Sequence, residues 1–128
     1  MDVRFRFSPF HSWETSGVLW RALVELIRDQ DPEFLKAEIP HPEGPSEENH
    51  FFDFSEFSIE ALKEWQNLMS GVQAKISAEN KDDQLEPLFF NQLLLCVGSL
   101  QQTLRIEISY RHWILKSKED SVIGLVPR

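Results

Sequence analysis

The chain has 128 residues, of which 41% are hydrophobic, and its 13 basic and 21 acidic residues give a formal net charge of −8. This length and apolar content predict one globular domain and exclude an intrinsically disordered chain. No apolar run approaches the roughly 20 residues of a membrane span, the first residues lack the apolar core of a signal peptide, and the single cysteine permits no internal disulfide. We therefore expect a cytoplasmic protein that forms a single domain over residues 1–124.

Two elements are predicted in the N-terminal part of the chain. Apolar and polar residues alternate over residues 3–7 (VRFRF), which predicts a strand with one buried face. Apolar residues then recur at helical spacing over residues 12–30, which predicts a helix with Thr15 or Ser16 as its N-cap. Pro32 follows directly and is expected to mark the end of this helix.

The middle of the chain predicts a loop, a strand and a long helix. Residues 40–49 (PHPEGPSEEN) hold three prolines, a glycine and three acids, which is typical of a loop. Residues 50–57 (HFFDFSEF) are dense in aromatics and predict a strand. Ser58 is a suitable N-cap for a helix over residues 58–77. The apolar residues of this helix recur at spacings of three and four and form one stripe: Ile59, Leu62, Trp65, Met69, Val72 and Ile76.

The C-terminal part is harder to interpret. Residues 85–100 fit a helical stripe, yet they contain continuous apolar runs, and we favour a buried strand over residues 90–97. A turn at Gly98 would then lead into a second strand over residues 104–110, where apolar and polar residues alternate. Residues 125–128 spell the first half of a thrombin cleavage site, and we interpret them as a cloning remnant outside the domain.

Together these elements predict an α+β fold. We expect a single, mostly antiparallel sheet of about four strands, with two main helices packed on one face. The opposite face of the sheet would expose the polar residues that alternate with the buried ones: Arg4, Arg6, Arg105, Glu107 and Arg111.

The negative charge is concentrated in one segment. Residues 25–64 contain twelve acids and three bases, a net charge of −9, whereas the rest of the chain is close to neutral. Nucleic-acid binding is disfavoured, because it requires a basic patch. The acidic segment is either a solvated surface that maintains solubility or an electrostatic binding surface for a basic partner.

The sequence contains no recognisable catalytic motif: CxxC, HExxH, GxSxG, a phosphate-binding loop and a dinucleotide fingerprint are all absent. Cys96 lies within an apolar run without a basic neighbour, which predicts a buried thiol rather than a nucleophile. His41, Glu43 and His50 include imidazole and carboxylate groups of the kind that ligate zinc or manganese, although their spacing matches no established ligand pattern. We expect no cofactor and no catalytic residue.

Several features of the second half of the chain carry a family resemblance. These are the aromatic strand FFDFSEF, the capped helix SIEALKEW, the LEP tripeptide with the apolar segment after it, and the alternating segment TLRIEISYRH. Over residues 50–115 the chain resembles small immunity proteins of bacterial toxin systems. The resemblance implies a protein that neutralises a cognate toxin, often a nuclease, by direct binding and performs no chemistry itself.

Our leading hypothesis is therefore a non-catalytic binding protein, an immunity or inhibitor protein for a basic toxin. Its candidate contact residues are the acids Glu43, Glu47, Glu48, Asp53 and Glu56. Aromatic anchors would come from Phe51, Phe52 or Trp65 if these side chains are exposed, and all three are core residues otherwise. The alternatives are a metal-dependent or ligand-binding protein that uses His41, Glu43 and His50, and a scaffold module that self-associates. We expect a monomer or a weak dimer.

Overall fold

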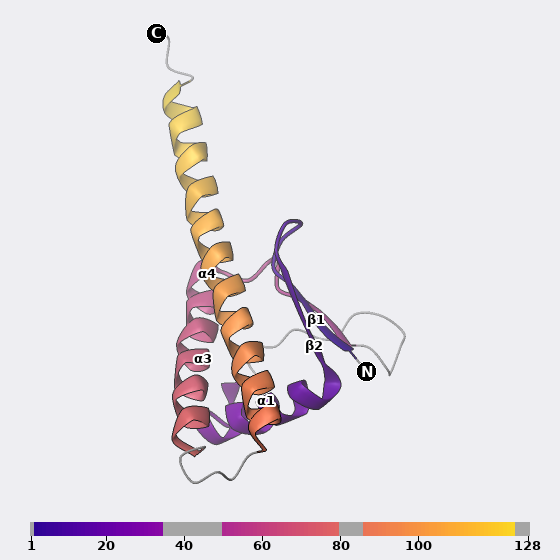
Figure 1. Cartoon of the computed structure of the whole chain (residues 1–128). Coiled ribbons are helices and arrows are strands. Elements are labelled where there is room, and N and C mark those ends of the chain that lie inside the picture. Colours follow the sequence, from indigo (N-terminus) through magenta and orange to yellow (C-terminus); the bar gives the residue numbers. More distant parts are fainter. Residues whose placement is uncertain (1, 35–49, 80–85, 125–128) are drawn as a thin grey trace.

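The fold was analysed in a computed structural model that describes residues 2–34, 50–79 and 86–124. The predicted α+β class is confirmed (Figure 1). The elements follow the chain in the order β1 (Asp2–Arg6), β2 (Ser12–Ser16), α1 (Gly17–Gln30), β3 (His50–Asp53), α3 (Ile59–Glu79) and α4 (Pro87–Gly124).

The three described strands form one mixed sheet in the order β2-β1-β3. The pair β1–β2 is antiparallel and the pair β1–β3 is parallel, so the prediction of about four mostly antiparallel strands is wrong in detail. Arg4 lies opposite Glu14, to which it donates a hydrogen bond of 3.1 Å, and Arg6 lies opposite Asp53. The outer face of the sheet therefore pairs opposite charges across its strands.

The predicted helix over residues 12–30 is in fact a strand followed by a helix. Residues 12–16 pair with β1, because Trp13 turns into the core while Ser12 and Glu14 face solvent, which is the period of a strand. Helix α1 begins only at Gly17. The hydroxyl of Ser16 accepts a hydrogen bond of 3.3 Å from the backbone N–H of Leu19, so the predicted N-cap is confirmed.

Helix α3 confirms the prediction of a long amphipathic helix. It begins directly after Ser58, whose hydroxyl accepts a hydrogen bond of 3.1 Å from the backbone N–H of Ala61. Five of the six residues in the predicted stripe are fully or almost fully buried: Leu62, Trp65, Met69, Val72 and Ile76.

The two strands predicted over residues 90–97 and 104–110 are wrong, because both segments belong to the single helix α4. Pro87 is its first residue. A proline is well tolerated there, because the backbone N–H of the first helical residue has no acceptor within the helix. Gly98 lies within the helix, not at a turn. The buried apolar residues of α4 recur at helical spacing: Leu93, Cys96, Val97, Leu100, Leu104 and Ile108.

Helices α3 and α4 run antiparallel and in contact, and α1 lies across their lower ends (Figure 1). The 38 residues of α4 span about 57 Å, whereas the 21 residues of α3 span about 32 Å. The C-terminal end of α4 therefore extends beyond both α3 and the sheet (Figure 1). None of the described helices combines the length and apolar character that crossing a bilayer requires.

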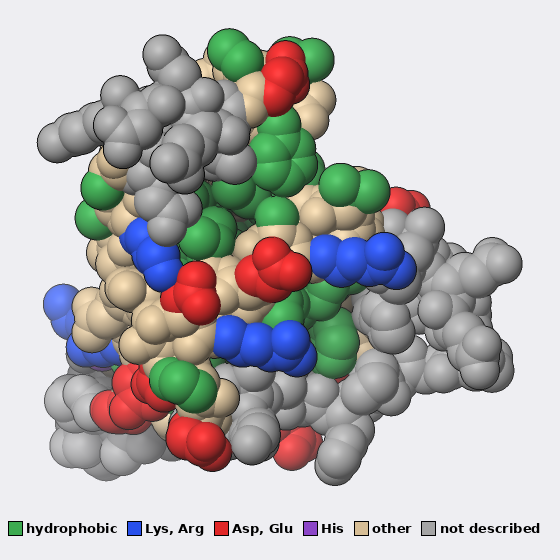
Figure 2. All heavy atoms as spheres, turned by 90° about the horizontal axis from the view of Figure 1, so that it is seen from below, with side chains coloured by type: hydrophobic (Ala, Val, Ile, Leu, Met, Phe, Trp, Pro, Cys, Tyr) green, Lys and Arg blue, Asp and Glu red, His purple; other side chains and the backbone are tan. Residues whose placement is uncertain are grey.

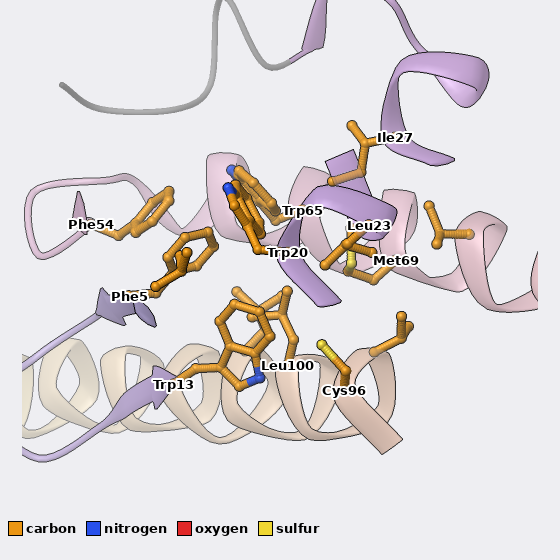
Figure 3. Packing of buried hydrophobic residues seen from close by; sticks show 14 of the residues in the cluster. Phe5, Trp13, Trp20, Leu23, Ile27, Phe54, Trp65, Met69, Cys96 and Leu100 are labelled. Carbon is orange, nitrogen blue, oxygen red and sulfur yellow. The ribbon is translucent and has the colours of Figure 1, made fainter. Parts of the chain in front are cut away.

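The core lies between the inner face of the sheet and the helices, and Phe5 lies within its aromatic part (Figure 3). The Phe5 side chain has no exposed surface. Its ring lies 4.6–6.1 Å, between centroids, from six other aromatic rings that come from four different elements and their connections. These rings belong to Phe7, Trp13, Trp20, Phe52, Phe54 and Trp65.

Candidate functional site

The structure places two of the five predicted contact acids. Asp53 ends strand β3, and Glu56 is exposed in the turn that connects β3 to α3. Glu43, Glu47 and Glu48 lie outside the described residues.

Asp53 holds the local backbone in place. Its carboxylate accepts a hydrogen bond of 2.9 Å from the backbone N–H of Ser55. Hydrogen bonds from Ser55 are the main cause that lowers the pKa of Asp53, and the nearby positive charge of Arg6 adds to them. Asp53 therefore fixes the turn that presents Glu56.

Among the described residues, the acids at the two ends of the acidic segment lie in separate regions of the fold. The acids of α1 and of the turn after it lie at the lower end of the molecule, where acidic and basic side chains stand beside one another (Figure 2). There, Asp29 accepts a hydrogen bond of 3.0 Å from Lys75. Glu56 and Glu60 lie at the other end, on the turn before α3 and on its first turn, and both are exposed.

A hollow of about 430 Å³ opens beside Glu56, where α4 leaves the body of the molecule. Its walls come from the β1–β2 loop, the β3–α3 connection and α4, and they are mostly apolar. The lining includes Phe7, Pro9, Phe57, Ile59, Tyr110, Ile114 and Leu115. Ser55 and Phe57, the two neighbours of Glu56, both line the hollow, whereas Glu56 itself is exposed on the same turn and is not one of the lining residues.

Glu107 is also part of the lining, although its side chain is only 1% exposed. One carboxylate oxygen is 2.8 Å from Nδ1 of His11, and the other accepts a hydrogen bond of 2.8 Å from Nε of Arg111. The predicted position of Glu107 and Arg111 on a solvent-facing sheet surface is therefore wrong. A buried carboxylate requires such partners, because desolvation strongly disfavours an unpaired charge.

The guanidinium of Arg111 connects α4 to two loops. Its Nη2 donates to the carbonyl oxygen of Phe7 at 2.9 Å and to those of Phe54 and Ser55 at 3.2 Å. Its Nη1 donates to the carbonyl oxygen of Phe57. Because these carbonyls belong to the β1–β2 loop and the β3–α3 connection, Arg111 fixes the hollow's three walls relative to one another.

Tyr110 and Leu115 line the hollow, and the exposed rings of Phe10 and Trp113 pack against Tyr110 beside it; we call these four residues the aromatic rim. Phe10, Trp113 and Leu115 are 72%, 64% and 51% exposed. The Tyr110 ring packs edge-on against Phe10 and stacks on Trp113, with centroids 5.6 Å and 6.4 Å apart. Clusters of exposed aromatic residues around a concave surface are typical of binding sites.

The aromatic residues that the sequence suggested as anchors for a partner do not belong to the rim. Phe52 and Trp65 are buried in the core, and Phe51 is half-buried on β3. The rim was missed because residues 104–110 were read with a strand period. The i, i+4 pair Glu107–Arg111, followed after His112 by three apolar residues, was the signal of a helix that leaves the core.

The predicted metal ligands are not tested by this arrangement. His41 and Glu43 lie outside the described residues, and His50 begins strand β3. Within residues 2–34, 50–79 and 86–124, no three His, Cys, Asp or Glu side chains come together in a way that suits a metal ion.

Cys96 is buried, and its thiol is expected to react slowly. It is 7% exposed, burial raises the pKa of the thiol, and its sulfur lies 3.4 Å from the hydroxyl oxygen of Thr15. Since only the thiolate is nucleophilic, a raised pKa leaves less reactive species at pH 8. We expect iodoacetamide to alkylate the native protein at least about tenfold more slowly than the urea-unfolded chain. Equal rates, followed by mass spectrometry, would show that the thiol is accessible.

Comparisons with protein-family models, with curated proteins and with solved structures found no match to this chain.

Proposed function

We propose that the protein is a non-catalytic binding protein that neutralises a basic partner, as the resemblance to toxin-immunity proteins implies. The observation that carries the proposal is the hollow with its aromatic rim, together with the exposed acid Glu56 on the connection that forms one of its walls. A partner would insert an apolar side chain into the hollow and place a Lys or Arg side chain against Glu56 and Glu60. Apolar anchors in a pocket, with charges at the rim, are the usual arrangement of a protein interface.

The fixed geometry of the hollow supports binding. Arg111 donates hydrogen bonds both to the Glu107 carboxylate and to the surrounding loop carbonyls, and its side chain is mostly buried. A preformed site loses little conformational entropy when a partner binds, which favours affinity. The predicted contact residues Glu43, Glu47 and Glu48 add negative charge to the same chain segment, and they remain part of the proposal as groups that steer a basic partner.

The proposal is tested by comparing matched charge reversals at the two ends of the molecule. The partner is captured from a lysate of the source organism at low salt and identified, and its binding to the purified chain is measured by surface plasmon resonance. We expect Glu56→Lys to weaken binding roughly tenfold or more, because it places a cation at the contact. Glu25→Lys is the control, since Glu25 is an exposed residue of α1 at the opposite end.

The two variants change the net charge equally, so long-range steering alone would affect both to the same extent. A selective loss with Glu56→Lys, together with a salt-dependent association rate and a blocked partner activity, supports the inhibitor proposal. Binding that is unchanged by Glu56→Lys would contradict it.

A further inference from the structure

A second concavity, of about 370 Å³, lies on the outer face of the sheet beside the β1–β2 loop, and we call it the sheet pocket. Basic, hydroxyl and aromatic side chains line it, and among the described residues no carboxylate does. The lining residues that matter for its chemistry are Arg4, Arg6, Phe10, His11, Ser12 and Phe51. The pocket therefore offers hydrogen-bond donors and positive charge to a ligand, whereas the hollow beside α4 is mostly apolar.

The register of the sheet brings these side chains together. Arg4 and Arg6 are two residues apart on β1, so both project from its outer face. Arg6 lies opposite Ser12 on β2, and Arg4 lies opposite Phe51 on β3. Residues directly opposite one another on the same face of a sheet are close neighbours. One arginine therefore stands beside a hydroxyl group and the other beside an aromatic ring.

The acids nearest to the two arginines leave donors available. Glu14 accepts a hydrogen bond of 3.1 Å from Nη2 of Arg4, which uses one of the three guanidinium nitrogens. The carboxylate of Asp53 accepts its hydrogen bond from Ser55, and the charge of Arg6 is the smallest of the causes that lower the pKa of Asp53. Arg6 is exposed, and its guanidinium forms no ion pair with another described residue.

His11 stands between the sheet pocket and the hollow. It lines the sheet pocket, whereas Glu107 lines the hollow. Nδ1 of His11 lies 2.8 Å from the Glu107 carboxylate, which is 1% exposed. Because this buried carboxylate occupies Nδ1 and orients the ring, Nε2 is the nitrogen that remains for a ligand.

We propose that the sheet pocket binds a small phosphate monoester whose organic part is a flat, apolar ring. The phosphoryl oxygens would accept hydrogen bonds from Arg6, Arg4 and His11. The planar fork of an arginine fits phosphate through two parallel hydrogen bonds. Three basic side chains also match the three terminal oxygens of a phosphate monoester better than the two oxygens of a carboxylate.

The aromatic side chains of the pocket indicate the ring. Phe51 is half-buried on the outer face of the sheet, and Phe10 is 72% exposed. A flat apolar group would pack against these rings, and aromatic pairs of this kind contribute beyond the area that they bury. The volume of the pocket is within the range of small-molecule sites, and a bare phosphate ion would leave most of it empty.

The probe for the test is phenyl phosphate, which combines the phosphoryl group with a flat ring. Its binding to the isotope-labelled full chain is followed by NMR titration, which gives an affinity and locates the site. We expect a Kd on the order of 0.1–1 mM. The largest shift changes should fall on residues 4–6, 10–12 and 51, because these surround the pocket.

Matched arginine variants test the residues of the site. Arg6→Gln should weaken binding at least about tenfold, because it removes the guanidinium that has no ion pair. Arg21→Gln is the control, since Arg21 is an exposed arginine of α1 outside the pocket, and it should change the affinity less than about twofold. Arg6→Lys keeps the charge but loses the fork, and we expect an intermediate loss. The same spectra show that each variant is folded.

Related ligands test the assigned chemistry. Inorganic phosphate, which lacks the ring, and benzoate, which has the ring and a carboxylate, should both bind more weakly than phenyl phosphate. Phenol should show no measurable binding. Equal binding of benzoate or phenol would overturn the phosphoryl assignment, and equal binding of inorganic phosphate would overturn the ring contact.

Equal weakening by Arg6→Gln and Arg21→Gln, shift changes away from the pocket, or no binding of phenyl phosphate at about 10 mM would overturn the site as a whole. The site is separate from the proposed function, because Arg6 lies on the sheet and does not line the hollow. These outcomes leave the inhibitor proposal intact, since that proposal is judged by partner binding to Glu56→Lys and Glu25→Lys.

Discussion

Replacing Arg111 with methionine is expected to lower the free energy of unfolding by about 3–5 kcal/mol. The variant leaves the Glu107 carboxylate, which is 1% exposed, without the guanidinium that satisfies one of its oxygens. It also removes the donors that four loop carbonyls share. Breaking a buried ion pair from one side costs far more than the pair itself contributes, because an uncompensated charge stays in the interior.

Urea unfolding followed by circular dichroism measures this effect, and Arg105→Met is the matched control. Arg105 is exposed on the same helix, and its replacement should change stability by no more than about 0.5 kcal/mol. The double variant Glu107→Leu/Arg111→Met should lose less than the sum of its single variants, because the two residues act as a unit. A small loss with Arg111→Met alone, comparable to that of Arg105→Met, would mean that water satisfies Glu107 and that the hollow is not fixed by this pair.

The position of this ion pair explains why the candidate site was not predicted from the sequence. Glu107 and Arg111 are neighbours on one helix, but His11 and the loop carbonyls lie far away in the chain, and only the tertiary fold brings them together. Residues 104–110 also satisfy two periods. Leu104 and Ile108 are four residues apart and buried, while Ile106 between them is 43% exposed. The apolar residues of this segment therefore fit both the two-residue period of a strand and the four-residue spacing of a helix.

Elements with a single unambiguous period were predicted correctly. Strand β1 alternates strictly between buried and exposed side chains, and α3 has a continuous stripe after a good N-cap. The segment over residues 12–16 was included in a predicted helix over residues 12–30, whose apolar residues recur at helical spacing. Pairing with β1 overrode that local pattern, as tertiary contacts commonly do in short segments. The acidic segment was identified correctly by its composition, but its division between two ends of the molecule depends on the fold.

Replacing Phe5 with alanine is expected to destabilise the protein by about 3–5 kcal/mol, the usual cost of removing a fully buried phenylalanine ring. Phe5 has no exposed surface, and its ring contacts aromatic side chains from the sheet, α1, α3 and their connections. The cost includes the transfer of the ring from water and the cavity that it leaves, which rigid aromatic neighbours cannot easily fill. Because a domain is stable by only about 5–15 kcal/mol, this single change removes a large part of the total.

The matched control is Phe10→Ala, which removes the same ring from the rim. Phe10 is 72% exposed and packs against Tyr110, so its loss should cost less than about 1 kcal/mol. Chemical denaturation of both variants distinguishes a core residue from a residue of the binding surface. Phe5→Ala should lower the unfolding midpoint strongly. Phe10→Ala should leave the midpoint nearly unchanged and should instead weaken binding of the partner. If Phe10→Ala were as destabilising as Phe5→Ala, the rim would be part of the core, and the inhibitor proposal could not rely on it as an exposed contact surface.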